Sequence, residues 1–356
     1  MNSKNTDKSR PSKLITVTGE ISCDDVDIIS PHEHVLIDIR NQFTGFEEIT
    51  LRKQSEQKVK IEKLGALSRN PYALRDNLVM DDEELAEQEL MNFKKAGGDA
   101  VADATTIGIG RDPLALKRIS RCTGIAIIAG CGYYTGDTHS KRLQEISVEK
   151  IVEEMIKEIK IGIDDTNIRA GLIGEIGTSE PIGETEKKVL IASAIVQKET
   201  GLGVLVHTYP WGHRAAEILK IFQENKADIT KVCICHIDAE IDYDYCKSIM
   251  EAGAFIEFDN FGKEFFIDKK GRGFAGGVFI RDIERVRAIK RFIDDGFVNN
   301  ILASCDVCLK TLLHRYGGWG YDHVLSNVIA MMSEEGIEEK DINTIIKGNP
   351  KRFLSV

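Results

Sequence analysis

Apolar runs alternate with amphipathic segments along most of the chain. Two short runs, residues 14–17 and 20–22, flank Thr18-Gly19 and predict a small hairpin. Eight further runs follow, each separated from the next by a segment with helical periodicity. These eight runs end near His34, Thr106, Tyr134, Thr178, His207, His236, Asp259 and Asp306. Because the runs are continuously apolar, they are typical of parallel strands that are covered on both faces.

Eight strand-and-helix units predict an α/β protein that folds as a (β/α)8 TIM barrel. We expect an N-terminal β-hairpin before the barrel and a C-terminal helical extension over residues 320–356. Residues 14–356 would form a single barrel domain, and the polar residues 1–13 a disordered tail. A doubly wound open sheet is the alternative, but no Gly-x-Gly-x-x-Gly follows an early strand. The connection over residues 39–80 is long enough to predict a lid or a binding loop.

Composition argues against several classes of protein. The chain has 47 basic and 57 acidic residues, a net charge of -10, which disfavours a general nucleic-acid binder. No apolar run approaches twenty residues, so we expect no membrane span. The polar N-terminal segment lacks the pattern of a secretory signal, and we expect a cytoplasmic protein whose eight cysteines are free thiols.

Residues that commonly bind metals end five of the predicted strands. His32 and His34 are two residues apart, so in a strand both imidazoles point to the same side. Each such residue alone could be a hydrogen-bonded core residue, but equivalent positions in a barrel converge on one mouth. The six candidates are His32, His34, Glu175, His207, His236 and Asp306. Four imidazoles and two carboxylates suit two divalent metals and predict a hydrolase.

The sequences around these residues resemble the phosphotriesterase-like branch of the amidohydrolase superfamily. The strings that carry the resemblance are SPHEHVLID, AGLIGEIGTSEP, LVHTYP, CHIDAE, ASCDVCLK, RYGGWGYDH and GNPKRFL, and they span the chain from about Leu14 to its end. The resemblance is closest to the phosphorylated-sugar lactonases of that branch.

The resemblance implies a role for each candidate ligand. His32, His34 and Asp306 would hold a buried metal, and His207 and His236 a more exposed one. Glu175 would bridge the two metals, where many relatives have a carboxylated lysine. Asp306 would also be catalytic, accepting a proton from a metal-bridging hydroxide as it attacks the substrate and passing it to the leaving group. The residue before this Asp is often His, but here it is Cys305.

The sequence leaves the identity of the metal and the oligomeric state open. Zn2+ is the default from the Irving–Williams order, and Mn2+ and Co2+ are alternatives. Barrel relatives often pair, so a homodimer is also an expectation.

The loop over residues 263–281 is basic in an acidic chain and points to an anionic substrate. Its glycines would let backbone N–H groups approach an anion. We expect Lys263, Arg272 and Arg281 to bind the substrate. By the resemblance, Tyr134 would face the substrate ring.

These features predict a hydrolase that opens a lactone ring and favour a phosphorylated sugar 1,4-lactone as the substrate. The alternatives are an amidase of a small acylated anion and a phosphotriesterase, because the same site can cleave C–N and P–O bonds. A non-catalytic metal-binding or ligand-binding barrel would require a missing ligand or a blocked mouth, whereas all six ligands are present.

Overall fold

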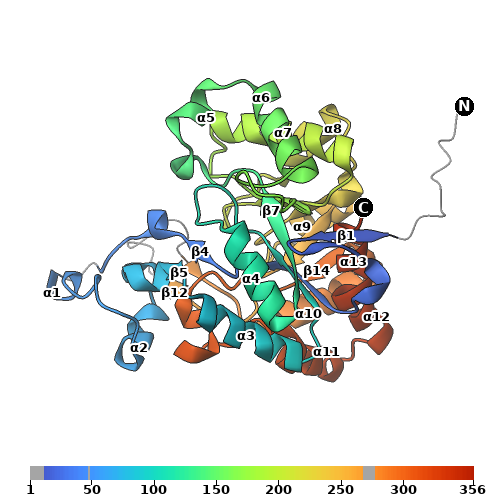
Figure 1. Ribbon diagram of the computed structural model, residues 1–356. Coiled ribbons are helices and arrows are strands. Elements are labelled where there is room, and N and C mark those ends of the chain that lie inside the picture. Colours follow the sequence, from blue (N-terminus) through green and yellow to red (C-terminus); the bar gives the residue numbers. More distant parts are fainter. Residues whose placement is uncertain (1–11, 47–48, 268–276) are drawn as a thin grey trace, which may run out of the picture.

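Eight parallel strands form one sheet that curls into a nearly closed barrel surrounded by helices (Figure 1). The computed structural model describes residues 12–46, 49–267 and 277–356. Around the sheet, the strands are β3 (Ile29–Glu33), β6 (Ala100–Asp103), β7 (Ala126–Cys131), β8 (Leu172–Gly177), β9 (Val204–His207), β10 (Val232–Ile234), β11 (Phe255–Phe258) and β14 (Ile301–Ala303). Each strand pairs with the next one along the chain, so the predicted barrel is confirmed and the doubly wound alternative is excluded.

The seam between β14 and β3 is joined through a buried carboxylate. Glu33, at the end of β3, accepts hydrogen bonds from the backbone N–H of Cys305 at 3.0 Å and of Val307 at 2.9 Å. The hydroxyl of Ser30 donates a third hydrogen bond to Glu33, at 2.8 Å. Burial raises the pKa of Glu33 to about 7. The carboxylate therefore holds the last strand end beside the first.

Alternation along the strands separates the barrel interior from the surrounding helix layer. In β9, Leu205 packs in the cluster that fills the barrel, whereas Val204 and Val206 pack in the cluster beneath the helices. His207 is two residues after Leu205 in the strand, so its side chain also points inward. In β11, Phe255 lies in the interior cluster, and Glu257 follows it on the same face.

The helices that cover the sheet begin and end where the sequence provides caps. Asp82 accepts the N–H of Leu85 at the start of α3, and Gly124, at φ 70°, ends α4. The helices of this layer are α3 (Glu83–Lys95), α4 (Pro113–Thr123), α5 (Lys141–Glu145), α6 (Val148–Lys160), α7 (Glu184–Thr200), α8 (Ala215–Glu224), α9 (Tyr243–Glu251) and α10 (Asp282–Asp294). The C-terminal extension adds α11 (Ile329–Glu334), α12 (Glu339–Asn343) and α13 (Asn349–Leu354).

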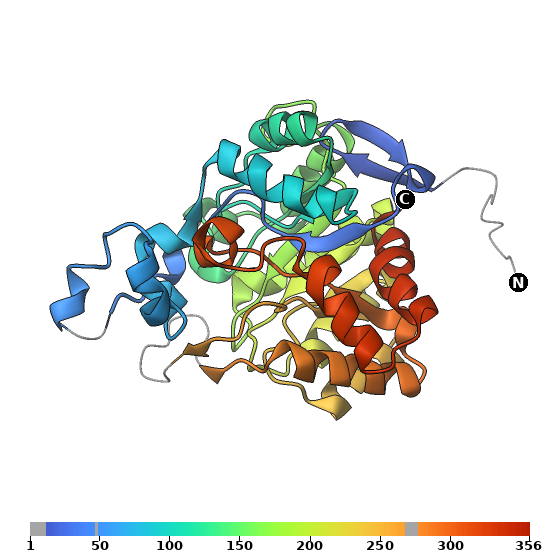
Figure 2. The ribbon, with the colours of Figure 1, turned by 90° about the horizontal axis from the view of Figure 1, so that it is seen from below.

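The long connection after β3 forms an excursion that protrudes from one side of the barrel (Figures 1 and 2). Its base is a short antiparallel pair, β4 (Ile37–Asp38) with β5 (Val79–Met80). It carries α1 (Ile49–Arg52) and α2 (Leu64–Leu67), and its own small core contains Val59, Leu67 and Leu74. A second pair, β12 (Phe266–Ile267) with β13 (Gly277–Val278), lies beside it, and Phe266 donates its N–H to the carbonyl of Ser68.

The N-terminal hairpin is confirmed as β1 (Lys13–Thr16) paired with β2 (Gly19–Ser22). Lys13 lies in β1 rather than in the expected tail, and its N–H donates to the carbonyl of Val356 at 3.1 Å. Residues 1–11 of that tail lie outside the described residues. Within the described ranges, no helix combines the length and apolar character needed to cross a membrane.

Candidate metal centre

The six predicted ligands lie at the carboxyl ends of five barrel strands, and all six are buried. His32 is in β3 and His34 follows it, Glu175 is in β8, and His207 ends β9. His236 and Asp306 come just after β10 and β14. Both have positive φ, 62° for His236 and 42° for Asp306, a conformation that non-glycine residues rarely adopt. Such residues cluster at functional sites, where the surroundings enforce the conformation.

The six side chains form two groups whose candidate donor atoms lie within 4.8 Å of one another. The first group is His32, His34 and Asp306, and Nε2 of His34 is 3.1 Å from Oδ1 of Asp306. In the second group, Oε1 of Glu175 is 2.9 Å from Nδ1 of His207 and 2.8 Å from Nε2 of His236.

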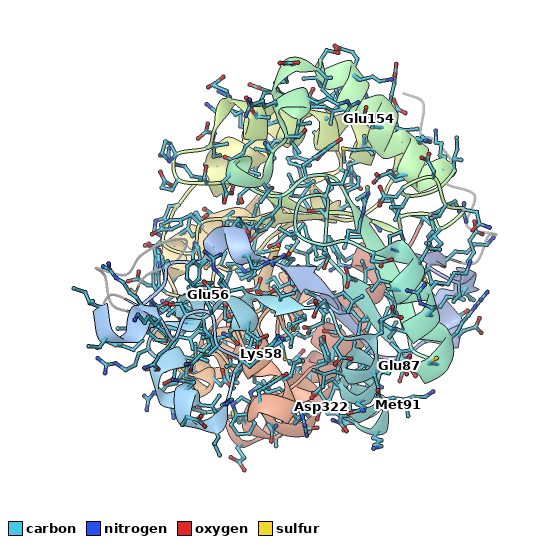
Figure 3. All side chains as sticks on the ribbon, turned by 60° about the vertical axis from the view of Figure 1, so that its left-hand side comes forward. Glu56, Lys58, Glu87, Met91, Glu154 and Asp322 are labelled. Atoms are coloured by element: carbon cyan, nitrogen blue, oxygen red, sulfur yellow. The ribbon has the colours of Figure 1, made fainter. Side chains whose placement is uncertain are left out.

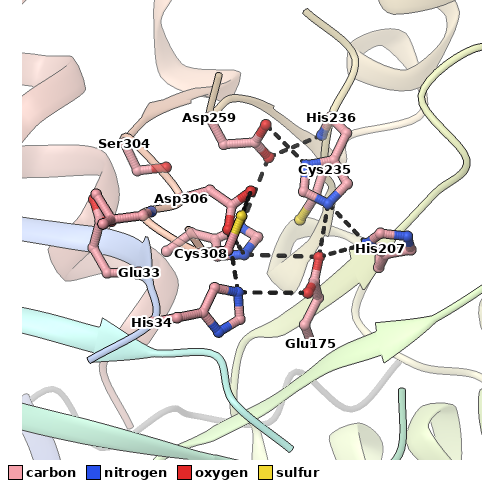
Figure 4. Close-up of polar contacts among 12 residues, drawn as sticks. Glu33, His34, Glu175, His207, Cys235, His236, Asp259, Ser304, Asp306 and Cys308 are labelled. Atoms are coloured by element: carbon pink, nitrogen blue, oxygen red, sulfur yellow. Dashed lines mark hydrogen bonds and ion pairs between the residues drawn. The ribbon is translucent and has the colours of Figure 1, made fainter. Parts of the chain in front are cut away.

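Glu175 lies between the two groups (Figure 4). Its Oε1 is also 3.7 Å from Nε2 of His32, and its Oε2 is 3.9 Å from Nε2 of His34. One carboxylate therefore reaches members of both groups, as a bridging ligand must.

Three of the imidazoles are oriented by partners on Nδ1. His32 Nδ1 lies 3.1 Å from Oε2 of Glu257, and His236 Nδ1 lies 3.0 Å from Oδ1 of Asp259. His34 Nδ1 lies 2.9 Å from the hydroxyl oxygen of Thr105, which donates its own hydrogen to a carbonyl at 3.0 Å. Nδ1 must then carry the proton in each ring, which leaves the Nε2 lone pair facing the centre. His207 is turned differently and presents Nδ1 to Glu175.

The surroundings of one buried nitrogen, Nε2 of His32, indicate whether these residues can bind a metal. Nε2 of His32 is buried and makes no hydrogen bond within the described part of the chain, although it lies 3.7 Å from both Glu175 and Asp306. Burial alone would lower the pKa of His32, but Glu175, Glu257 and Asp306 raise it to about 10. The raised pKa reflects the negative charge around His32, which a divalent ion would neutralise in place of the second proton, and imidazole and carboxylate donors suit ions such as zinc.

A cavity opens onto this centre and is lined on its other sides by mostly apolar side chains. The residues that line it are His34, Ile37, Ile39, Gln42, Tyr72, Ile109, Tyr134, Glu175, His207, Pro210, His236, Asn260, Lys263, Phe265, Phe279, Asp306, Cys308 and Leu309. The hydroxyl of predicted Tyr134 is 3.2 Å from Nδ1 of His207. Burial raises the pKa of Tyr134 well above its usual value, so the phenol keeps its proton.

The predicted cations are not gathered around the cavity. Lys263 does line it, but its ammonium is buried in an ion pair with Asp306. Arg281 is exposed at the start of α10, where it pairs with Glu284, and does not line the cavity. Arg272 lies outside the described residues. Because residues 268–276 lie outside the described residues, an anion-binding loop over residues 263–281 stays a prediction.

Several residues of the site have weak sequence signals. Glu257 and Asp259 could have been suspected, because each places a carboxylate in a run that is otherwise apolar. Gln42 and Tyr72 line the cavity from the excursion, which is predicted as a lid or binding loop without any particular residue standing out. Cys305, in place of the common His, is buried and uses its N–H to contact Glu33.

Comparisons with known proteins identify the family to which the chain is similar. The model of the phosphotriesterase family matches residues 12–354. The N-acetyltaurine hydrolase of Danio rerio is 35% identical over 350 residues, which cover 96% of this chain and 98% of that protein. The N-acetyltaurine hydrolase of Homo sapiens is 36% identical over 303 residues, covering 85% and 86% of the two chains. A crystal structure of a resiniferatoxin-binding protein from Rhodobacter sphaeroides superposes with a TM-score of 0.92, at 34% identity, over 96% of this chain and 94% of that chain.

Proposed function

This chain belongs to the phosphotriesterase family, and on that premise we propose that it is an amidase that cleaves small N-acylated anions using two divalent metal ions. The observation that carries the hydrolytic function is the pair of ligand groups with Glu175 between them. The choice of an amide is supported by relatives named N-acetyltaurine hydrolase, which match nearly the whole chain.

The comparisons favour the amide over the lactone substrate that the sequence places first. The argument for a phosphorylated lactone depends on a basic loop of which residues 268–276 lie outside the described residues, while Lys263 is paired with Asp306 and Arg281 does not line the cavity. The amide alternative needs only a small anion and an acyl group, and N-acetyltaurine has both. We therefore place N-acyl amino sulfonates and N-acyl amino acids first.

The residues that would hold the metals are the six described above, with Zn2+ as the proposed ion and Mn2+ or Co2+ as alternatives. His32, His34 and Asp306 would hold one ion, His207 and His236 the other, and Glu175 both. When bound, the two ions would lower the pKa of a shared water and polarise the substrate carbonyl.

The protein's own groups then complete the reaction. As water adds to the acyl carbon, the carboxylate of Asp306 accepts a proton and afterwards donates it to the leaving nitrogen. The C–N bond breaks and gives a carboxylate and an amine. The ion pair with Lys263 favours the ionised form of Asp306, because it lowers the pKa of this carboxyl despite burial, which alone would raise it. The phenol of Tyr134, at the cavity wall, is placed to donate to the acyl oxygen.

The test is a comparison of substrates with the metal-loaded protein. We expect N-acetyltaurine to be hydrolysed with a kcat/KM of roughly 10⁴ M⁻¹s⁻¹ or more, as is ordinary for an enzyme on its own substrate. N-acetyl amino acids, pentonate lactones with and without a 5-phosphate, and paraoxon would be measured alongside. Faster turnover of a lactone than of every amide would overturn the proposal and return the lactonase to first place.

A further inference from the structure

Gln42 lines the cavity from the first turn of the excursion. It belongs to a 3-10 turn, Arg40–Gln42, and only 8% of its surface is exposed. Its backbone N–H donates to the carbonyl of Ile39 at 2.9 Å, but its side-chain amide makes no hydrogen bond to any other described residue. Its amide atoms are not among the fully buried polar atoms of the described residues, so they stay accessible to a ligand that enters the cavity.

The cavity offers an incoming anion few other donors. Among the described residues that line it, Lys263 is the one lysine or arginine, and its ammonium is already paired with Asp306. The carboxylates of Glu175 and Asp306 line the same space and would repel an anion until metals neutralise them. Recognition of an anion therefore falls to neutral N–H and O–H groups.

A glutamine suits this position for a physical reason. Its Nε2 presents two hydrogens to an oxyanion without adding a charge. An arginine in the same place would be drawn into an ion pair with the carboxylates of the centre, as Lys263 is. Ile37 and Ile39 flank Gln42 on the same segment and give the rest of that wall an apolar surface.

We propose that Gln42 determines specificity by donating its Nε2 hydrogens to the anionic group on the amine half of the substrate, a sulfonate or a carboxylate. This inference rests on the proposed amidase function. It places the anion beneath the excursion and the scissile carbonyl over the metal centre.

The experiment compares two substrates that differ in charge. N-acetyltaurine carries a sulfonate, and N-[2-(methylsulfonyl)ethyl]acetamide has a neutral sulfone of similar shape. We expect Gln42→Leu to lower kcat/KM for the sulfonate about tenfold, and Gln42→Glu to lower it about 100-fold through like-charge repulsion. For the sulfone, both variants should stay within about threefold of the parent protein, because a sulfone gains less from a donor than an anion does. Gln88→Glu, on the exposed face of α3, adds the same charge elsewhere and should change neither value.

A binding measurement separates this inference from the proposed function. Calorimetric titration with taurine should show a Kd that rises from the parent protein to Gln42→Leu and further in Gln42→Glu. Equal losses on the two substrates, or an unchanged Kd for taurine, would overturn the role of Gln42. If the parent protein cleaves neither amide, the amidase proposal fails, and the taurine titration still decides whether Gln42 binds an anion.

Discussion

Single residues at the centre carry the chemistry, and their surroundings explain why each residue type is needed. Asp306 has Oδ1 at 3.1 Å from His34 and Oδ2 paired with Lys263, so its two oxygens serve different partners. Glu175 reaches both ligand groups with one carboxylate. Gln42 lines the same cavity from another element.

Asp306→Asn should abolish most of the activity and preserve the fold. An amide has nearly the shape of the carboxylate but cannot accept the proton, so we expect kcat to fall by about 10²–10⁴-fold. Asp24→Asn, on an exposed acidic residue, is the matched control and should leave kcat unchanged. Circular dichroism would verify folding, and retention of more than about a tenth of kcat would contradict a proton-transfer role for Asp306.

At the scale of elements, loops and strand ends set the positions of these residues. A register shift in β8, between Ile173 and Ile176, changes which residues face inward. In a regular strand, Glu175 would face the same side as Ile173, two residues earlier. Ile173 and Ile176 both pack under the helices, so the shift allows Glu175 to face the barrel interior instead. The loop after β7 is held by His139, whose Nε2–H donates to the carbonyl of Tyr134 at 2.7 Å.

His139 should make the stability of the protein sensitive to acid. Its Nδ1 is buried without a hydrogen-bond partner in the described ranges, and burial lowers the pKa of His139 below its usual 6.5. As the pH falls below about 6.5, the unfolded chain binds a proton that the folded protein resists, so the free energy of unfolding decreases. Urea unfolding at pH 7.5 and 5.5 should show a smaller decrease in His139→Gln, whose amide can still donate to Tyr134. The exposed His213→Gln variant should behave like the parent protein. An equal acid-induced decrease in His139→Gln would contradict this assignment.

The excursion is fixed to the barrel through Asp76. This carboxylate accepts from Lys310 at 2.8 Å and from Lys58 at 2.7 Å, and Figure 3 labels Lys58 on the excursion. Asp76→Ala should loosen the excursion, because Lys310 would be left 10% exposed without its ion pair. Since Gln42 and Tyr72 line the cavity from this element, we expect KM to rise several-fold and proteolysis within the excursion to accelerate. Glu62→Ala, on an exposed residue of the same element, is the control. Unchanged KM and proteolysis in Asp76→Ala would show that other contacts fix the excursion.

At the scale of the whole molecule, the barrel concentrates charge where all of its strands converge. Glu175, Asp306, Glu257 and Asp259 are buried within one small region together with four imidazoles. Such a cluster is costly unless cations neutralise it. The homodimer expected for barrel relatives remains a prediction, which light scattering would test.

Removal of metal should therefore lower stability as well as activity. If the free ion is present at roughly 1,000 times its Kd, each site contributes about 4 kcal/mol to the free energy of unfolding. We expect dialysis against a chelator to lower Tm and abolish turnover, and Zn2+, Mn2+ or Co2+ to restore both. Elemental analysis should find two ions per chain in the parent protein. A Tm that does not change when two ions are removed would contradict this account of the buried carboxylates.

The sequence by itself determined the barrel and the set of residues that meet at its mouth. Continuous apolar runs indicate parallel strands, because a strand that is buried on both faces has apolar residues at successive positions. A barrel then brings the ends of these strands together, so His32, Glu175 and Asp306 become neighbours without any further information.

Tertiary structure alone decided which atoms these residues present and what surrounds them. The His32–Glu257 contact joins residues 225 positions apart, and Lys263, which the sequence assigns to the substrate, is paired with Asp306. A charged group that is buried loses its hydration and must pair with a residue that the fold brings near it. That residue can be distant in the sequence, so the order of residues along the chain does not identify it.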